Sequence, residues 1–98
     1  MAVFVPGQEV RMPCAASRGG PLGEAVVTVE SAQGPISGFV RADAVTGEGE
    51  KAFLRAWIVK VTDDLVVVEV AGSFCLTAAG RAAVRADWAS LNLQPVGA

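Results

Sequence analysis

The sequence offers few residues that could do chemistry. Histidine and tyrosine are both absent, so proton transfer near neutral pH would depend on carboxylates, lysines or the two cysteines. Cys75 lies between Phe74 and Leu76 in an apolar run, which predicts a buried structural thiol. Cys14 follows Pro13, and no residue near it in the sequence would activate its thiol. Two cysteines this far apart indicate neither a disulfide framework nor a metal-binding motif, and we expect no cofactor.

A repeated tetrapeptide contains two aspartates that could form an acid pair, although we assign no catalytic residue. Val-Arg-Ala-Asp occurs twice, with its arginines at Arg41 and Arg85 and its aspartates at Asp43 and Asp87. If the repeat marks an internal duplication, twofold symmetry could bring the two carboxylates together as an acid pair. Together with Trp88, these four residues form a candidate pocket for a small ligand or a minor enzymatic activity near the C-terminal segment. The favoured interpretation is coincidence in a chain rich in valine and alanine, with each aspartate capping a turn and pairing with its own arginine at the surface.

The adjacent Asp63 and Asp64 are turn residues rather than metal ligands, because two neighbouring carboxylates supply too few oxygens to hold a cation. They separate two runs of strand-forming residues, 56–62 and 65–71, and so predict a β-hairpin. Folding the chain about the turn gives one fully apolar face, whose facing pairs are Val61 with Val66, Val59 with Val68, and Trp57 with Val70.

The opposite face of this hairpin is more apolar than a solvated surface requires. It carries Ile58, Lys60, Leu65, Val67 and Glu69. We expect this face to bury against a second copy of the chain or against another protein. Burial beneath the N-terminal strand or the C-terminal segment is the alternative.

The remaining elements that would position these residues are short strands. The stretch 4–12 predicts a turn that leads into a first strand, with Val10 and Met12 facing inward and Pro13 ending it. Further strands are expected at 24–31 and 36–41; a glycine-rich linker covers 46–51, and a strand over 72–76 would continue past a glycine bulge. The segment 81–91 admits two interpretations. Val84, Trp88 and Leu91 have helical spacing, but the parallel with the first copy of the tetrapeptide favours a strand through Arg85, a 3₁₀ turn over 86–90 and a last strand over 91–93.

Two stretches are similar to parts of Src-homology-3-type barrels. Phe4-Val5-Pro6-Gly7-Gln8-Glu9-Val10 resembles the entry strand of such barrels, and Gly34-Pro35-Ile36-Ser37-Gly38-Phe39-Val40 resembles the Gly-x-x-x-Gly-aromatic-Val strand of bacterial members. The resemblance and the strand spacing imply an all-β fold: a small Src-homology-3-like barrel of five to seven strands with a short C-terminal helix or 3₁₀ turn. Such barrels serve many roles, so the resemblance implies no function.

Composition limits the remaining possibilities. The 98 residues are 52% hydrophobic and 18% charged, which predicts one folded domain over 1–98. A net charge of −2 with scattered lysines and arginines argues against a nucleic-acid partner. The apolar runs are too short for a signal peptide or a membrane span, so we expect a cytoplasmic protein. The favoured function is a non-catalytic protein-binding or self-assembly module.

Overall fold

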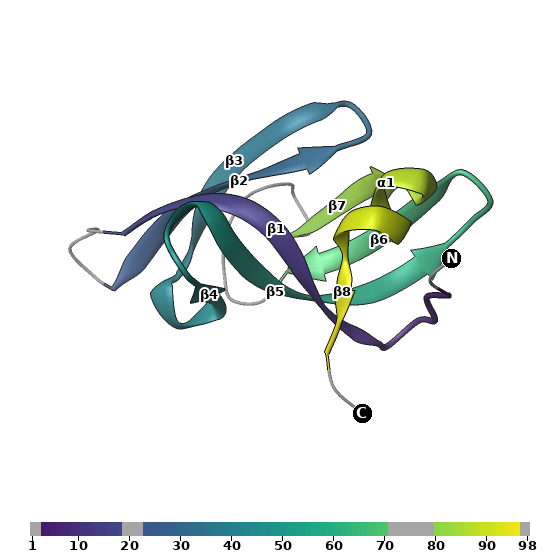
Figure 1. The fold of residues 1–98 in the computed structure, drawn as a ribbon, viewed down its shortest axis with the longest axis horizontal. Helices are drawn as coiled ribbons and strands as arrows, with labels where there is room; N and C mark the ends of the chain where they lie inside the picture. The colour runs from purple at the N-terminus through teal and green to yellow at the C-terminus, as the bar shows by residue number, and fades with distance from the viewer. Residues whose placement is uncertain (1–2, 19–22, 71–79, 97–98) are drawn as a thin grey trace.

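A computed structural model describes residues 3–18, 23–70 and 80–96 of the chain. The predictions for Cys75 and for a strand over 72–76 lie outside the described residues. The described part is a curled antiparallel sheet with the strand order β3-β2-β1-β5-β6-β7 (Figure 1). These strands are β1 (Glu9–Arg18), β2 (Glu24–Ser31), β3 (Gly34–Arg41), β5 (Gly49–Val61), β6 (Leu65–Val70) and β7 (Arg81–Arg85).

Four short elements complete the fold. The two-residue strand β4 (Val45–Thr46) pairs with β5, and β8 (Gln94–Pro95) pairs with β1. The 3₁₀ helix η1 (Ala42–Ala44) follows β3, and the helix α1 (Ala86–Asn92) follows β7. The expected all-β fold is confirmed, and its shape fits a small Src-homology-3-like barrel.

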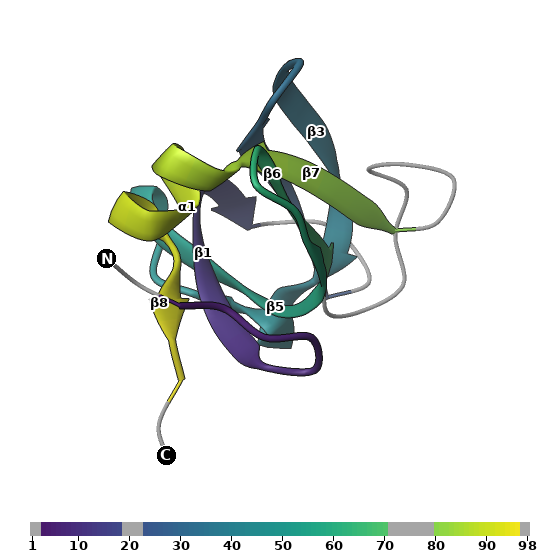
Figure 2. The same cartoon turned by 90° about the vertical axis from the view of Figure 1, so that its right-hand side faces the viewer.

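The core lies inside the curl of the sheet (Figure 2). Alternate residues of every long strand point inward, as the two-residue period of a strand requires. The largest fully buried side chains are Met12, Leu54, Ile58, Val10, Val27, Val29, Val40, Val66, Val68 and Val84. The curl also brings the β2–β3 turn against β7, where the Ala32 N–H donates a hydrogen bond of 2.8 Å to the Ala83 carbonyl.

The β5–β6 hairpin has the expected turn but a different register beyond it. Val61 pairs with Val66 as predicted, and then the register shifts between Ile58 and Lys60, leaving Val59 as an extra residue. An extra residue moves every earlier side chain of the strand to the opposite face. Ile58 therefore pairs with Val68 and is 1% exposed in the core, which corrects its assignment to the outer face.

Trp57 is displaced by the same bulge. It was expected on the core face opposite Val70, but it lies half-buried and pairs with Glu69 on one side and Glu9 on the other. The Arg55 guanidinium lies over its ring, 5.3 Å from the ring centroid. The indole ring therefore has a cation over its exposed face. The rest of the side chain packs against the edge of the hydrophobic core.

Pro13 does not end the first strand, because β1 continues to Arg18. A proline lacks the N–H that a neighbouring strand would need. On one side β1 pairs with β8 at Val10 and Arg11 and with β2 only from Ala15 onward, so Pro13 lies in the gap between these two partners. The strand can continue because its missing donor falls where no acceptor strand lies.

The segment after residue 80 largely follows the favoured interpretation. A strand runs to Arg85, but the turn that follows is α-helical rather than 3₁₀, as the hydrogen bond from the Leu93 N–H to the Ala89 carbonyl shows. Its end is reinforced by the Asn92 side chain, which donates to the Trp88 carbonyl. Because the helix extends to Asn92, the last strand begins at Gln94 instead of residue 91.

The two copies of Val-Arg-Ala-Asp occupy equivalent places. Arg41 has φ −65° and ψ 138° before η1, and Arg85 has φ −66° and ψ 140° before α1. The next residue closes a hairpin in both cases: the Ala42 N–H donates to the Gly23 carbonyl, and the Ala86 N–H donates to the Asp64 carbonyl, each at 2.8 Å. The repeat is therefore structural, and each copy turns the chain out of a three-strand meander.

The equivalence extends to the whole chain. The half β1-β2-β3-η1-β4 matches the half β5-β6-β7-α1-β8, and the two meet where β1 pairs with β5. Each half gives its last short strand to the first strand of the other, since Val45 pairs with Leu54 and Gln94 pairs with Arg11. The linker between the halves is shorter than the predicted range 46–51, because β5 already begins at Gly49.

Candidate binding surface

The five residues predicted to form a pocket are divided between two ends of the sheet. Arg41 pairs with Asp43 at 3.0 Å beside η1, and Arg85 pairs with Asp87 at 3.4 Å beside α1. Figure 1 shows η1 and α1 well separated along the long axis of the molecule. The internal symmetry thus keeps the two aspartates apart instead of forming an acid pair, and only Arg85, Asp87 and Trp88 share one region.

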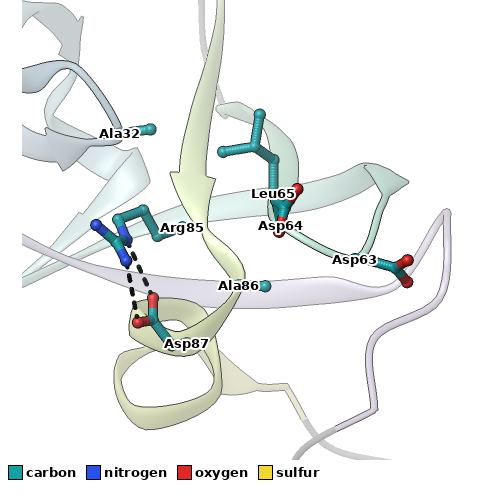
Figure 3. Close-up of a pocket in the computed structure, with 7 residues that line it drawn as sticks. All are labelled: Ala32, Asp63, Asp64, Leu65, Arg85, Ala86 and Asp87. Carbon is teal, nitrogen blue, oxygen red and sulfur yellow. Dashed lines mark hydrogen bonds and ion pairs between the residues drawn. The ribbon is translucent and has the colours of Figure 1, made fainter.

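Three hollows lie around β7. The largest, about 480 Å³, is lined by Ala32, Asp63, Asp64, Leu65, Arg85, Ala86 and Asp87 (Figure 3). A second, about 310 Å³, is lined by Ser31, Ala32, Gln33, Ile36, Leu65, Val67, Arg81, Ala82 and Ala83. A third, about 150 Å³, is lined by Glu30, Ser31, Val84, Arg85 and Trp88.

These hollows share their walls. Ala32 and Leu65 line the first two, Arg85 lines the first and third, and Ser31 lines the second and third. They therefore lie next to one another around the Ala32–Ala83 hydrogen bond, and we call the area that they cover the β7 surface. It includes residues of both predicted sites: Leu65 and Val67 of the hairpin face, and Arg85, Asp87 and Trp88 of the pocket.

The charged groups of the β7 surface are exposed, and two of them form an ion pair. Figure 3 shows the Arg85 side chain turned toward Asp87, while Asp63 points away from both. Arg85 and Asp87 expose 70% and 72% of their side chains, so water screens the ion pair. Among the described residues, no three cysteine or carboxylate side chains are placed to hold a metal ion.

Comparison of the chain with models of protein families finds no matching family. Comparisons with curated proteins and with solved structures find no significant similarity. The function must therefore be inferred from the site itself.

The apolar part of the β7 surface comes from the outer side of the β6–β7 hairpin. Leu65 and Val67 are half-buried there, although β6 places its other valines in the core. Val67 lies opposite Ala83, a small residue, which leaves the hollow that Ile36 closes from the β2–β3 hairpin. Of the other predicted interface residues, Lys60 and Glu69 are exposed, and Glu69 lies 3.9 Å from Arg81.

Cys14 is ruled out as a nucleophile by its surroundings. Its side chain is in the core and the residue is 6% exposed. Burial raises the pKa of the thiol from 9.0 to about 11, so the reactive thiolate is scarce at neutral pH. A structural role explains this residue.

Sequence reasoning did not find the contribution of the β2–β3 hairpin. The expected elements leave Ala32 unassigned and place Ile36 only in a strand, yet both residues line the hollow that contains Val67. Their position depends on the curl of the sheet, which brings residues about fifty positions apart into contact through the Ala32–Ala83 bond. The signal available in the sequence is Gln33-Gly34-Pro35, which predicts a turn near this point; the turn itself lies at Ala32 and Gln33, between the paired Ser31 and Gly34.

No helix in the described parts of the chain has the length and apolar character needed to cross a bilayer.

Proposed function

We propose that the protein is a non-catalytic protein-binding or self-assembly module, and that it binds through the β7 surface. The observation that carries the proposal is that half-buried Leu65 and Val67 line an apolar hollow, with further hollows beside it around the Ala32–Ala83 bond. A hollowed area with an apolar floor and charged margins is the usual form of a protein-binding patch. Half-buried Leu65 and Val67 supply the floor, and water leaving them would contribute most of the binding free energy.

A second copy of the chain is the first partner that we expect. An isologous dimer buries the same patch twice, so a modest apolar area is used on both sides of the interface. Charges at the margin, such as Arg81 and Asp87, would then lie near the opposite charges of the other copy.

A small-ligand site or a minor enzyme is less well supported. That function required Arg41, Asp43, Arg85 and Asp87 to converge with Trp88, and they lie beside two different turns. Each arginine is already paired with the aspartate two residues later. The hollow beside Trp88 offers only Arg85 and Glu30 as charged groups.

The test is sedimentation velocity over a range of protein concentrations, with Val67→Glu as the variant. We expect wild-type self-association that Val67→Glu abolishes, because a carboxylate would have to be buried in the interface. Circular dichroism should stay unchanged, since Val67 lies on the outer side of the sheet.

Val26→Glu is the matched control, because Val26 is an outward-facing residue of β2, 43% exposed, and lines none of the three hollows. It should leave association unchanged. A wild-type chain that remains monomeric at high concentration, or association that is lost only in Val26→Glu, would count against the β7 surface.

A further inference from the structure

The two equivalent halves of the chain depend on each other for completion. Each half is a meander of three strands whose first strand receives the last short strand of the other half: β4 pairs with β5, and β8 pairs with β1 (Figure 1). The long pairing of β1 with β5 joins them from Glu9–Trp57 to Cys14–Ala52, and we call it the β1–β5 seam. Neither half closes its own sheet.

We propose that a second copy of the chain can replace either half, giving an exchanged dimer in which the half from β1 to β4 of one copy pairs with the half from β5 to β8 of the other. This goes beyond the proposed function, because the exchange uses the β1–β5 seam and none of the residues of the β7 surface. The partner is a second copy of the chain, because the face of each half along the β1–β5 seam is complementary to the other half of this same sequence.

The burial of the β1–β5 seam favours exchange of halves between two chains over separation of the halves within one chain. Its inward-facing residues are all buried, with exposed fractions of 6% or less: Val10, Met12, Cys14, Ala52, Leu54 and Ala56. Separating the halves would expose this whole row to water. A second copy supplies the same row in the same register, so every pairing of the closed fold is restored between the chains.

One short connection decides between the two forms. The halves are joined covalently only through the turn between β4 and β5, at residues 47–48. Gly47 has φ +84°, and a Cβ there would lie 2.9 Å from the Lys51 carbonyl oxygen. The closed turn therefore requires glycine at this position, and any side chain favours an open connection that carries β5 away from β4.

Exchange can be detected with a disulfide across the seam. Cys14 and Ala52 are direct partners, and cross-strand Cα atoms lie within the range that a disulfide spans. One chain carries Cys14→Ser and Ala52→Cys, and the other keeps Cys14 and Ala52; Cys75→Ser is present in both. Neither chain alone can form a bond across its own seam.

The two chains are unfolded in urea, mixed and refolded together at high concentration under mild oxidation. We expect a disulfide-linked heterodimer on a non-reducing gel, and none when the chains are refolded apart and then mixed, because both positions are then buried. A chain with Ala52→Cys and native Cys14 shows that the bond can form within one molecule. If that control oxidises and the co-refolded pair gives no heterodimer, the proposal is wrong.

A second measurement does not depend on the disulfide. Gly47→Ala should raise the dimer-to-monomer ratio in gel filtration by about tenfold or more, from the strain of a left-handed residue. Gly34→Ala is the matched control, since Gly34 also has positive φ, +112°, but lies in the β2–β3 turn within one half with no heavy atom within 4 Å of an added Cβ. It should leave the ratio unchanged.

Val67→Glu separates exchange from association through the β7 surface. The exchanged dimer that forms when unfolded chains are refolded together should persist in Val67→Glu, whereas association of chains that have stayed folded, which uses the β7 surface, should not. Equal dimer ratios in Gly47→Ala, Gly34→Ala and the wild-type chain would overturn the exchange.

Discussion

Met12 and Leu54 lie directly opposite each other on β1 and β5, both fully buried, and they are also equivalent residues of the two halves. Leu54 pairs with Val45, the residue that follows η1, and Met12 stands next to the Arg11–Gln94 pair, where Leu93 follows α1. The centre of the fold is thus a contact between two copies of one position, and its stability depends equally on both halves.

Replacing either residue at this contact should destabilise the protein strongly. We expect Met12→Ala and Leu54→Ala each to lower the free energy of unfolding by about 2–5 kcal/mol. Each truncation leaves a cavity between paired strands, and these strands cannot move together to fill it. Urea unfolding followed by circular dichroism measures the loss. Val3→Ala, at a residue 81% exposed, should change it by less than about 0.5 kcal/mol. Similar small losses in all three variants would contradict the placement of the core.

The bulge at Val59 makes a clear prediction about neighbouring residues. Ile58→Asp should destabilise the fold by at least about 3 kcal/mol or prevent folding, because it buries a carboxylate without a partner. Lys60→Asp, two residues later and exposed, should change stability by less than about 1 kcal/mol. Urea midpoints of the two variants are compared. A regular hairpin without the bulge would tolerate Ile58→Asp, so a folded and stable Ile58→Asp variant would exclude this register.

Cys14 should make stability depend on pH at the alkaline end. Its thiol has a pKa of about 11 in the folded chain against 9.0 for an unburied thiol, so the folded state holds the proton more tightly. The stability that results is fully present below pH 9 and is lost as the pH rises through about 11. Urea midpoints are measured from pH 7 upward for a Cys75→Ser chain and for the same chain with Cys14→Ala. Parallel curves for the two chains would contradict this prediction.

The two Arg–Asp pairs should act independently. Asp43→Asn and Asp87→Asn each remove an exposed ion pair, and each should lower stability by less than about 1 kcal/mol. In the double variant the effects should add to within about 0.5 kcal/mol, as expected of sites that share no partner. A double-mutant cycle on urea unfolding provides the measurement. A larger coupling energy would mean that the carboxylates interact after all.

Local patterns in the sequence predict the strands well where each strand has a clear inward and outward face. Val10 and Met12 were expected to face inward and are both fully buried, and the Asp63-Asp64 turn sets the Val61–Val66 pair. The predicted register failed further along the strand, away from the turn. The extra residue at Val59 has no signature among similar apolar neighbours, so Ile58 and Trp57 were assigned to the wrong faces.

Tertiary contacts explain the other differences. A proline usually ends a strand, but Pro13 lies between the stretches of β1 that pair with β8 and with β2. The residues of the predicted pocket do not come together, because the symmetry that relates the two copies of the tetrapeptide also separates them. The β7 surface could be predicted only in part, since Leu65, Val67, Arg85 and Trp88 were recognised while the β2–β3 turn opposite them was not.

The position of β1 in the sheet also sets the order in which a newly made chain can fold. The first strand can pair with β2 early, but its other partners are β5 and β8, and its pairing with β8 joins Val10 to Pro95. On the ribosome, β1 must therefore wait for nearly the whole chain to emerge before both of its edges are covered. Folding should be slow for so short a chain, because its decisive contacts join distant residues. During that wait the β1 edge is open to pairing with a strand of a neighbouring nascent chain.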